Sequence, residues 1–127
     1  MSLVFDASAI IRLIELEPNK AFDILRGQYT IDLVYYEIGN YLWKISKSSI
    51  INIEPLIKAF NGALSLMNIV SIGLNNDVVN LARKMNITYY DAAYVYSAMK
   101  LNTKLVTDDK ELIKKFPNIT MNISELI

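Results

Sequence analysis

The first hydrophobic segment of the chain, residues 3–5, runs directly into Asp6, and small residues then open a helix. A short apolar run that ends at a polar residue is typical of a buried strand. In a parallel α/β sheet, a carboxylate in this place points into the crevice beyond the strand's C-terminal edge, where such sheets bind ligands. The pattern therefore predicts a site at Asp6.

Strand and helix patterns alternate along the rest of the chain. Amphipathic or capped segments predict helices at residues 9–16, 19–25, 35–47, 53–67, 75–85, 89–101 and 111–116. Short apolar segments predict extended structure at residues 29–34, 69–72, 104–107 and 119–121. This alternation predicts a single α/β domain over residues 1–127, with a mostly parallel central sheet and helices on both faces.

Turn residues set the expected helix ends. We expect Asn19 to cap the second helix and Gly27 to end it. Ser48 and Ser49 are expected to break the helix that begins at residue 35, and Pro55 fits the first turn of the next helix.

Three later segments carry acids that can return to the crevice at Asp6. Glu37 lies on the helix predicted at residues 35–47, with Asn40, one helical turn further on, on the same face. Asp91 stands at the start of the helix predicted at residues 89–101. The pair Asp108 and Asp109 follows the strand predicted at residues 104–107.

Composition limits the chemistry of such a site. The chain has 127 residues, 53% hydrophobic and 20% charged, and its 13 Lys+Arg balance its 13 Asp+Glu, which argues against electrostatic capture of nucleic acid as the main binding mode. It contains no histidine and no cysteine, which excludes disulfides, zinc–thiolate sites and histidine-based acid–base catalysis. Converging carboxylates repel one another unless a cation compensates, and oxygen ligands favour Mg²⁺ or Mn²⁺. We also expect a cytoplasmic protein without a membrane span, because polar residues interrupt the longest uncharged run, residues 59–76.

These segments together resemble the PIN domain, and more narrowly the single-domain VapC-type toxins. The resemblance covers essentially the whole chain: a strand into Asp-Ala-Ser, a helix with Glu-x-x-Asn, then Tyr-Asp-Ala-Ala-Tyr and Leu-Val-Thr-x-Asp. It implies a Mg²⁺- or Mn²⁺-dependent endoribonuclease, commonly a homodimer paired with a protein antitoxin. The positions that match the family's metal-binding acids are Asp6, Glu37, Asp91 and Asp109. Ser8 and Thr107 match polar neighbours of the site.

Each acid also has a structural interpretation. Asp6 can act as a helix N-cap, Glu37 as a solvated helix residue, and Asp91 as the start of its helix. Asp108 with Glu111 forms a capping-box pattern, which predicts Asp108 as the cap and leaves Asp109 to the site.

Other residues near the acidic motifs are secondary candidates. Asn40 can orient Glu37 or a water molecule. The tyrosines most suited to border the site and stack on bases are Tyr36, Tyr90 and Tyr94. Three basic side chains can hold flanking phosphates: Arg12, Lys44 and Lys110.

Rival classes fit less well. A phosphohydrolase of the haloacid dehalogenase type needs a second acid where this chain has Ser8, and a receiver-like domain needs an acidic pair after its first strand. The more serious alternative is a PIN fold without catalysis, which serves as an RNA-binding or protein-interaction scaffold. Four acids at motif positions argue against it.

Overall fold

The structure is a computed structural model and describes residues 2–48 and 51–127. In these residues, five parallel strands form one sheet in the order β3-β2-β1-β4-β5. The strands are β1 (Val4–Phe5), β2 (Tyr29–Ile31), β3 (Asn68–Val70), β4 (Leu105–Val106) and β5 (Thr120–Met121). The expected parallel sheet is confirmed.

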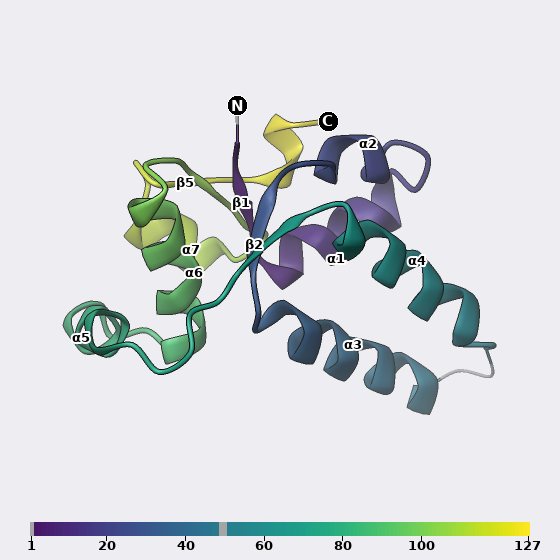
Figure 1. The fold of residues 1–127 in the computed structure, drawn as a ribbon, viewed down its shortest axis with the longest axis horizontal. Helices are drawn as coiled ribbons and strands as arrows, with labels where there is room; N and C mark the ends of the chain where they lie inside the picture. Colours follow the sequence, from purple (N-terminus) through teal and green to yellow (C-terminus); the bar gives the residue numbers. More distant parts are fainter. Residues whose placement is uncertain (1, 49–50) are drawn as a thin grey trace.

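Helices alternate with these strands in the described residues and cover both faces of the sheet, as Figure 1 shows. They are α1 (Ala7–Leu16), α2 (Ala21–Leu25), α3 (Val34–Ser48), α4 (Glu54–Ser65), α5 (Asn76–Met85), α6 (Tyr89–Lys100) and α7 (Lys110–Lys115), followed by the 3₁₀ turn η1 (Ile123–Glu125). Helices α1 to α4 lie on one side of the sheet, and α5 to α7 lie on the other. No helix in residues 2–48 and 51–127 is long and apolar enough to cross a membrane.

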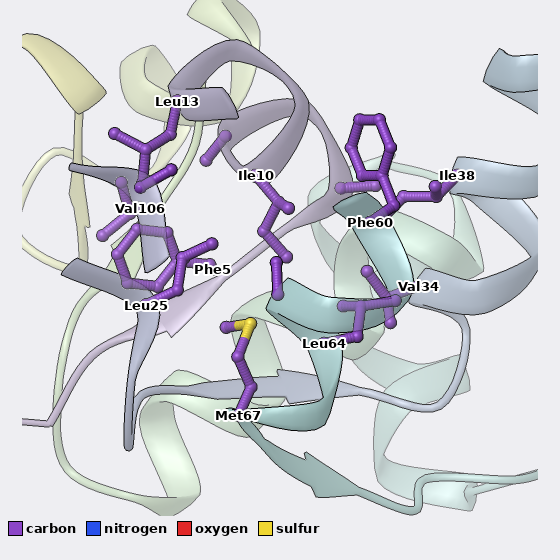
Figure 2. Packing of buried hydrophobic residues seen from close by; sticks show 14 of the residues in the cluster. Phe5, Ile10, Leu13, Leu25, Val34, Ile38, Phe60, Leu64, Met67 and Val106 are labelled. Atoms are coloured by element: carbon purple, nitrogen blue, oxygen red, sulfur yellow. The ribbon is translucent and has the colours of Figure 1, made fainter. Parts of the chain in front are cut away.

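The core consists of two apolar clusters, one on each face of the sheet. Successive residues of β1 alternate between them: Phe5 packs with α1, α3 and α4, while Val4 packs with α5, α6 and α7. Figure 2 shows the first cluster, in which Phe5, Ile10 and Phe60 are buried side chains from different elements. Because β1 is buried on both faces, the residue that follows it is held in a fixed position.

The order of the strands places a topological switch point beside β1. From β1 the chain adds β2 and then β3 on one side, and it later adds β4 and β5 on the other side. Connections to the two sides leave a crevice at the C-terminal ends of β1 and β4, the usual ligand site of open α/β sheets. Asp6 follows β1 there, and Thr107 follows β4.

Most predicted element ends agree with the structure to within a few residues, and the predicted cap of α2 differs. Gly27 ends α2 with a φ of +77°, as expected, because glycine adopts this conformation without strain. Asn19 is not the cap of α2: Lys20 takes that position and makes no side-chain capping bond. The extended segment expected at residues 29–34 is shorter: β2 ends at Ile31, a turn follows at residues 32–33, and α3 begins at Val34. Ser49 lies outside the described residues.

Candidate active site

The four predicted acids line one pocket of about 180 Å³ at the switch point. The sequence separates the four widely, and the crossover connections of the sheet bring them together. The pocket is lined by Asp6, Ala7, Ser8, Glu37, Asp91, Tyr94 and Asp109.

Each of these acids belongs to the N-terminus of a different helix. Asp6 is the N-cap of α1, and Asp109 is the N-cap of α7. Glu37 and Asp91 lie in the first turns of α3 and α6. The partial positive charge of a helix N-terminus stabilises a nearby carboxylate, so four converging N-termini offset part of the repulsion between the acids.

Asp6 is the most deeply buried of the four, with 6% of its surface exposed. Its Oδ1 accepts hydrogen bonds from Ser8 Oγ at 2.7 Å and from the Ala9 backbone N–H at 2.9 Å. Burial raises the pKa of Asp6 to about 6, although hydrogen bonds from Thr107, Ser8 and Ala9 lower it, and the charge of Glu37 raises it further. Asp6 therefore caps α1, and its ionised form is destabilised by burial in the pocket.

Glu37 is fixed by a tyrosine from another helix. The Tyr94 hydroxyl donates a hydrogen bond of 2.7 Å to Glu37 Oε1. Burial raises the pKa of Glu37, the Tyr94 bond lowers it, and the charge of Asp91 raises it again. Tyr94 is only 2% exposed, so the prediction that it stacks on bases is wrong, although it does border the pocket.

Asp91 and Asp109 interact across the pocket. Burial raises the pKa of Asp91, and the charge of Asp109 raises it further, while a hydrogen bond with the Thr88 side chain lowers it. Thr88 is the N-cap of α6, and its Oγ1 accepts from the Asp91 backbone N–H at 3.1 Å. The alternative that Asp91 itself caps this helix is thus not realised.

The predicted division of labour between Asp108 and Asp109 is wrong in one respect. The N-cap of α7 is Asp109, whose Oδ1 accepts from the backbone N–H groups of Glu111 at 2.9 Å and Leu112 at 3.2 Å. Helix α7 consequently begins at Lys110, one residue before the predicted start. Asp108 is exposed, and its backbone N–H donates to Ser8 Oγ at 3.1 Å. Asp109 lines the pocket as predicted, but it also has the capping role assigned to Asp108.

Ser8 and Thr107 connect the first acid to the last. Ser8 Oγ donates to Asp6 and accepts from the Asp108 backbone, 100 residues away. Thr107 is fully buried, forms a hydrogen bond to Asp6, and its Oγ1 accepts from the Asp109 backbone N–H at 3.1 Å. Both hydroxyls therefore hold the carboxylate of Asp6 and the start of α7 in a common arrangement.

The remaining candidates lie outside this pocket. Asn40 lines an adjoining pocket of about 280 Å³ together with Leu33, Tyr36, Glu37 and Tyr90. Arg12, Lys44 and Lys110 are not among the described residues that line the acidic pocket, so their contact with phosphates stays a prediction. Sequence reasoning missed the Tyr94–Glu37 bond, because residues 57 positions apart carry no local signal of contact.

The donor chemistry of the pocket suits a hard divalent cation, since the ionisable groups other than Tyr94 are carboxylates. Within residues 2–48 and 51–127, no three acidic side chains are already gathered closely enough to hold a metal ion. In both Asp6 and Asp109 the capping bonds end on Oδ1, so Oδ2 is left out of the cap. The Oδ2 atoms are therefore the ones that could face a cation without loss of the two caps.

Fold and pocket define a class: a single α/β domain with a cluster of carboxylates at the switch point of a parallel sheet. Comparison with known proteins agrees. Residues 3–117 match the PIN domain family. The chain is 36% identical to Ribonuclease VapC3 of Pyrobaculum aerophilum, over 92% of this chain and 96% of that protein. It is 31% identical to Exonuclease VapC9 of the same organism, over 67% of this chain and 64% of that protein.

Solved structures show the same architecture. PAE2754 from Pyrobaculum aerophilum superposes with a TM-score of 0.88 and 26% identity, over 99% of this chain and 93% of that one. A PilT N-terminus domain protein, SSO1118 from Sulfolobus solfataricus, has the fold in common at a TM-score of 0.52 and 17% identity, over 99% of this chain and 90% of that one. The chain belongs to the PIN-domain family and is of the VapC type.

Proposed function

We propose that this protein is a divalent-metal-dependent endoribonuclease that cleaves single-stranded or structured RNA in the cytoplasm as the toxin of a toxin–antitoxin pair. The observation that carries the proposal is the single pocket in which Asp6, Glu37, Asp91 and Asp109 converge. Similarity to Ribonuclease VapC3 over nearly the full length of both chains supports a nuclease.

In this proposal the four acids hold Mg²⁺ or Mn²⁺. Such an ion supplies charge neutralisation at the phosphodiester and activates a water molecule for attack on phosphorus. Ser8 and Thr107 keep the Asp6 carboxylate in place, and Tyr94 does the same for Glu37. Asn40, beside Glu37 in the adjoining pocket, is suited to orient Glu37 or a water molecule.

The alternative, a PIN-fold scaffold without catalysis, is less well supported. Burial and mutual repulsion raise the pKa values of Asp6, Glu37 and Asp91, so ionised acids destabilise the fold near neutral pH. A scaffold gains nothing from such a cluster, whereas a metal-dependent nuclease requires it.

The partner and oligomer belong to the same proposal. Helices α3 and α4 form an apolar groove of about 380 Å³, whose walls include Leu42, Trp43 and Ile57, with Trp43 54% exposed. An amphipathic segment of an antitoxin fits such a groove. We expect a basic side chain of that antitoxin to pair with the acids of the pocket. We propose that the free protein is a homodimer.

The test is cleavage of matched linear and circular RNA of one sequence, with Mn²⁺, Mg²⁺ or EDTA. An endonuclease opens the circle, whereas an exonuclease degrades only the linear form. We expect both RNAs to be cut with metal, neither to be cut in EDTA, and neither to be cut by Asp6→Asn. An Asp6→Asn protein that cleaves as well as wild type, free of contaminating nuclease, would falsify the mechanism. A wild-type protein that binds RNA but never cuts it would favour the scaffold.

A further inference from the structure

A second, apolar pocket of about 190 Å³ lies at the same edge of the sheet as the acids. It forms beyond the C-terminal ends of β2 and β3, next to the ends of β1 and β4 that bear the acidic pocket. Its walls come from the segments after these two strands and from the first turns of α3 and α6. The residues that line it are Ile31, Asp32, Leu33, Tyr36, Ile72, Gly73, Tyr89, Tyr90 and Ala93.

A third pocket lies between this apolar pocket and the acidic one. The adjoining pocket that contains Asn40 has Leu33, Tyr36 and Tyr90 in common with it and Glu37 in common with the acidic pocket. Tyr36 and Tyr90 therefore lie beside the route that an RNA strand with a phosphate at the acids can take.

The walls suit the flat face of an unpaired base. Tyr36 is 77% exposed and Tyr90 is 57% exposed, so both rings are open to a ligand. Tyr89 is fixed, because its hydroxyl donates to the Gly73 carbonyl and accepts from the Asn75 backbone N–H at 2.9 Å. A volume of 190 Å³ is below the roughly 300–1,000 Å³ of sites for drug-sized ligands, so it fits one ring system and not a whole nucleotide.

One charged group, Asp32, stands in this apolar wall. Among the described residues, its carboxylate accepts two long hydrogen bonds, from the Ile72 backbone N–H at 3.4 Å and from Ser71 Oγ at 3.5 Å. It can thus accept from a ligand that donates hydrogen bonds. Adenine, cytosine and guanine each carry an exocyclic amino group, which offers two N–H donors for this carboxylate, whereas uracil offers only its ring N3–H.

We propose that the pocket of Tyr36, Tyr89, Tyr90 and Asp32 binds one unpaired nucleobase of an RNA strand whose neighbouring phosphate lies at the acidic pocket, with preference for an amino-bearing base. The inference rests on the proposed function and names the substrate more closely. Stacking on aromatic side chains selects single-stranded RNA, because the bases of a duplex are already stacked.

The test measures binding separately from cleavage. Short fluorescent oligoribonucleotides are titrated by anisotropy, in Mg²⁺, with Asp6→Asn protein and with Asp6→Asn combined with Tyr36→Ala, Tyr90→Ala or Tyr36→Phe. We expect the alanine variants to lose roughly 5- to 150-fold in affinity, as for one stacked base, and Tyr36→Phe to lose little. Tyr35→Ala is the matched control, because it removes an exposed ring one residue away that lines the α3–α4 groove instead.

An abasic scan of the RNA locates the base. At one position only, removal of the base should lower the affinity of the Asp6→Asn protein for the RNA. With the base removed at that position, the Asp6→Asn protein and its Tyr36→Ala and Tyr90→Ala variants should bind the RNA equally. At that position uracil should bind more weakly than the other bases, and Asp32→Ala should remove this preference. Equal behaviour of all positions would overturn the proposal.

Light scattering on the same samples tests the competing occupant, a second copy of the chain. If Tyr36→Ala and Tyr90→Ala change the oligomeric state, and affinity follows only that change, the pocket is a protein interface and the proposal is overturned. If the wild-type protein does not cleave RNA but the abasic scan still locates one base, the proposed nuclease function is wrong and the proposed base-binding pocket is supported.

Discussion

Asp6 combines two roles whose energies oppose each other, since it caps α1 and carries a buried charge. Its pKa of about 6 in the folded protein lies above its ordinary value of 3.8, so the folded state holds this proton more tightly than the unfolded state. As pH rises between these values, the unfolded chain loses the proton first, and the free energy of unfolding falls. The shift corresponds to a loss of up to about 3 kcal/mol.

Asp6→Asn should remove this loss, because asparagine caps a helix about as well as aspartate and carries no charge. In EDTA, thermal melts of wild type and Asp6→Asn should be similar near pH 4. The variant should become progressively more stable than wild type up to pH 7. Parallel curves over this range would show that the Asp6 charge is not strained.

Asp108 and Asp109 provide a matched pair in which only one member faces the pocket. Asp109→Asn retains the cap of α7, so its melting temperature should stay close to that of wild type. Its RNA cleavage should fall by more than the 10- to 100-fold typical of residues that only support a metal ligand. Asp108→Asn should stay near wild type in both measurements, because Asp108 is exposed and neither caps α7 nor lines the pocket. The reverse order of activities would refute the assignment of the site to Asp109.

Tyr94→Phe removes the hydroxyl that donates to Glu37 and keeps the ring in the core. Without that bond the pKa of Glu37 should rise further, since the bond lowers it, and the carboxylate should become less well positioned. We expect Mn²⁺ affinity, measured by calorimetry, to fall by about 10-fold, as for loss of one charge-assisted hydrogen bond. Tyr96→Phe, on the same helix, is the control. Equal Mn²⁺ affinity of the two variants would exclude a positioning role for Tyr94.

At the scale of elements, the N-termini of four helices, α1, α3, α6 and α7, form the site. Strands β1 and β4 lead directly into Asp6 and Thr107, while α3 and α6 enter the site at their first turns. Helix α3 also separates two surfaces, with Tyr36 and Glu37 toward the pockets of the sheet edge and Trp43 toward the groove with α4. Any fraying of these first turns should therefore disturb the acids.

Thr88→Ala tests this dependence in α6. Loss of the N-cap should cost about 1 kcal/mol of stability and lower the melting temperature by roughly 3–6 °C for a domain of this size. Because Thr88 Oγ1 accepts from the Asp91 backbone, the first turn should loosen and Mn²⁺ affinity should fall as well. Thr88→Ser keeps the hydroxyl and should restore both values. A Thr88→Ala protein with wild-type Mn²⁺ affinity would show that the cap does not position Asp91.

For the whole molecule, the proposed partner and the proposed metal compete for one set of acids. Affinity for an antitoxin should fall as Mn²⁺ rises, and Asp6→Asn should weaken both ligands, because each pairs with the same carboxylates. Trp43→Glu should also abolish partner binding by placing a charge in the apolar groove, while Trp43→Phe should retain it. Titration of the co-purified complex with Mn²⁺ measures the competition.

Expression in cells provides a separate test of the toxin role. The wild-type chain should arrest growth, and Asp6→Asn should relieve the arrest. A harmless wild-type chain without a co-purifying protein would reject the toxin role.

Local sequence patterns determined the elements and the chemistry of this protein. Apolar runs that end in polar residues located the strands, and their alternation with helices predicted the parallel sheet. The absence of histidine and cysteine limited the pocket to oxygen ligands. Local patterns placed acids at strand ends and helix starts, and the resemblance to the PIN domain selected Asp6, Glu37, Asp91 and Asp109, which line the pocket.

Tertiary structure decided what depends on distant residues. The sequence from Asp108 to Glu111 is compatible with a cap at either aspartate; in the fold, Ser8 binds the Asp108 backbone and Thr107 binds that of Asp109, so Asp109 is the cap. The pKa of Asp6 and the bond from Tyr94 to Glu37 likewise depend on packing across the sheet. Such hydrogen bonds and such desolvation arise only when the strands assemble into a sheet whose two faces are buried by helices. Hydrophobic periodicity and helix caps, in contrast, depend on residues a few positions apart in the chain.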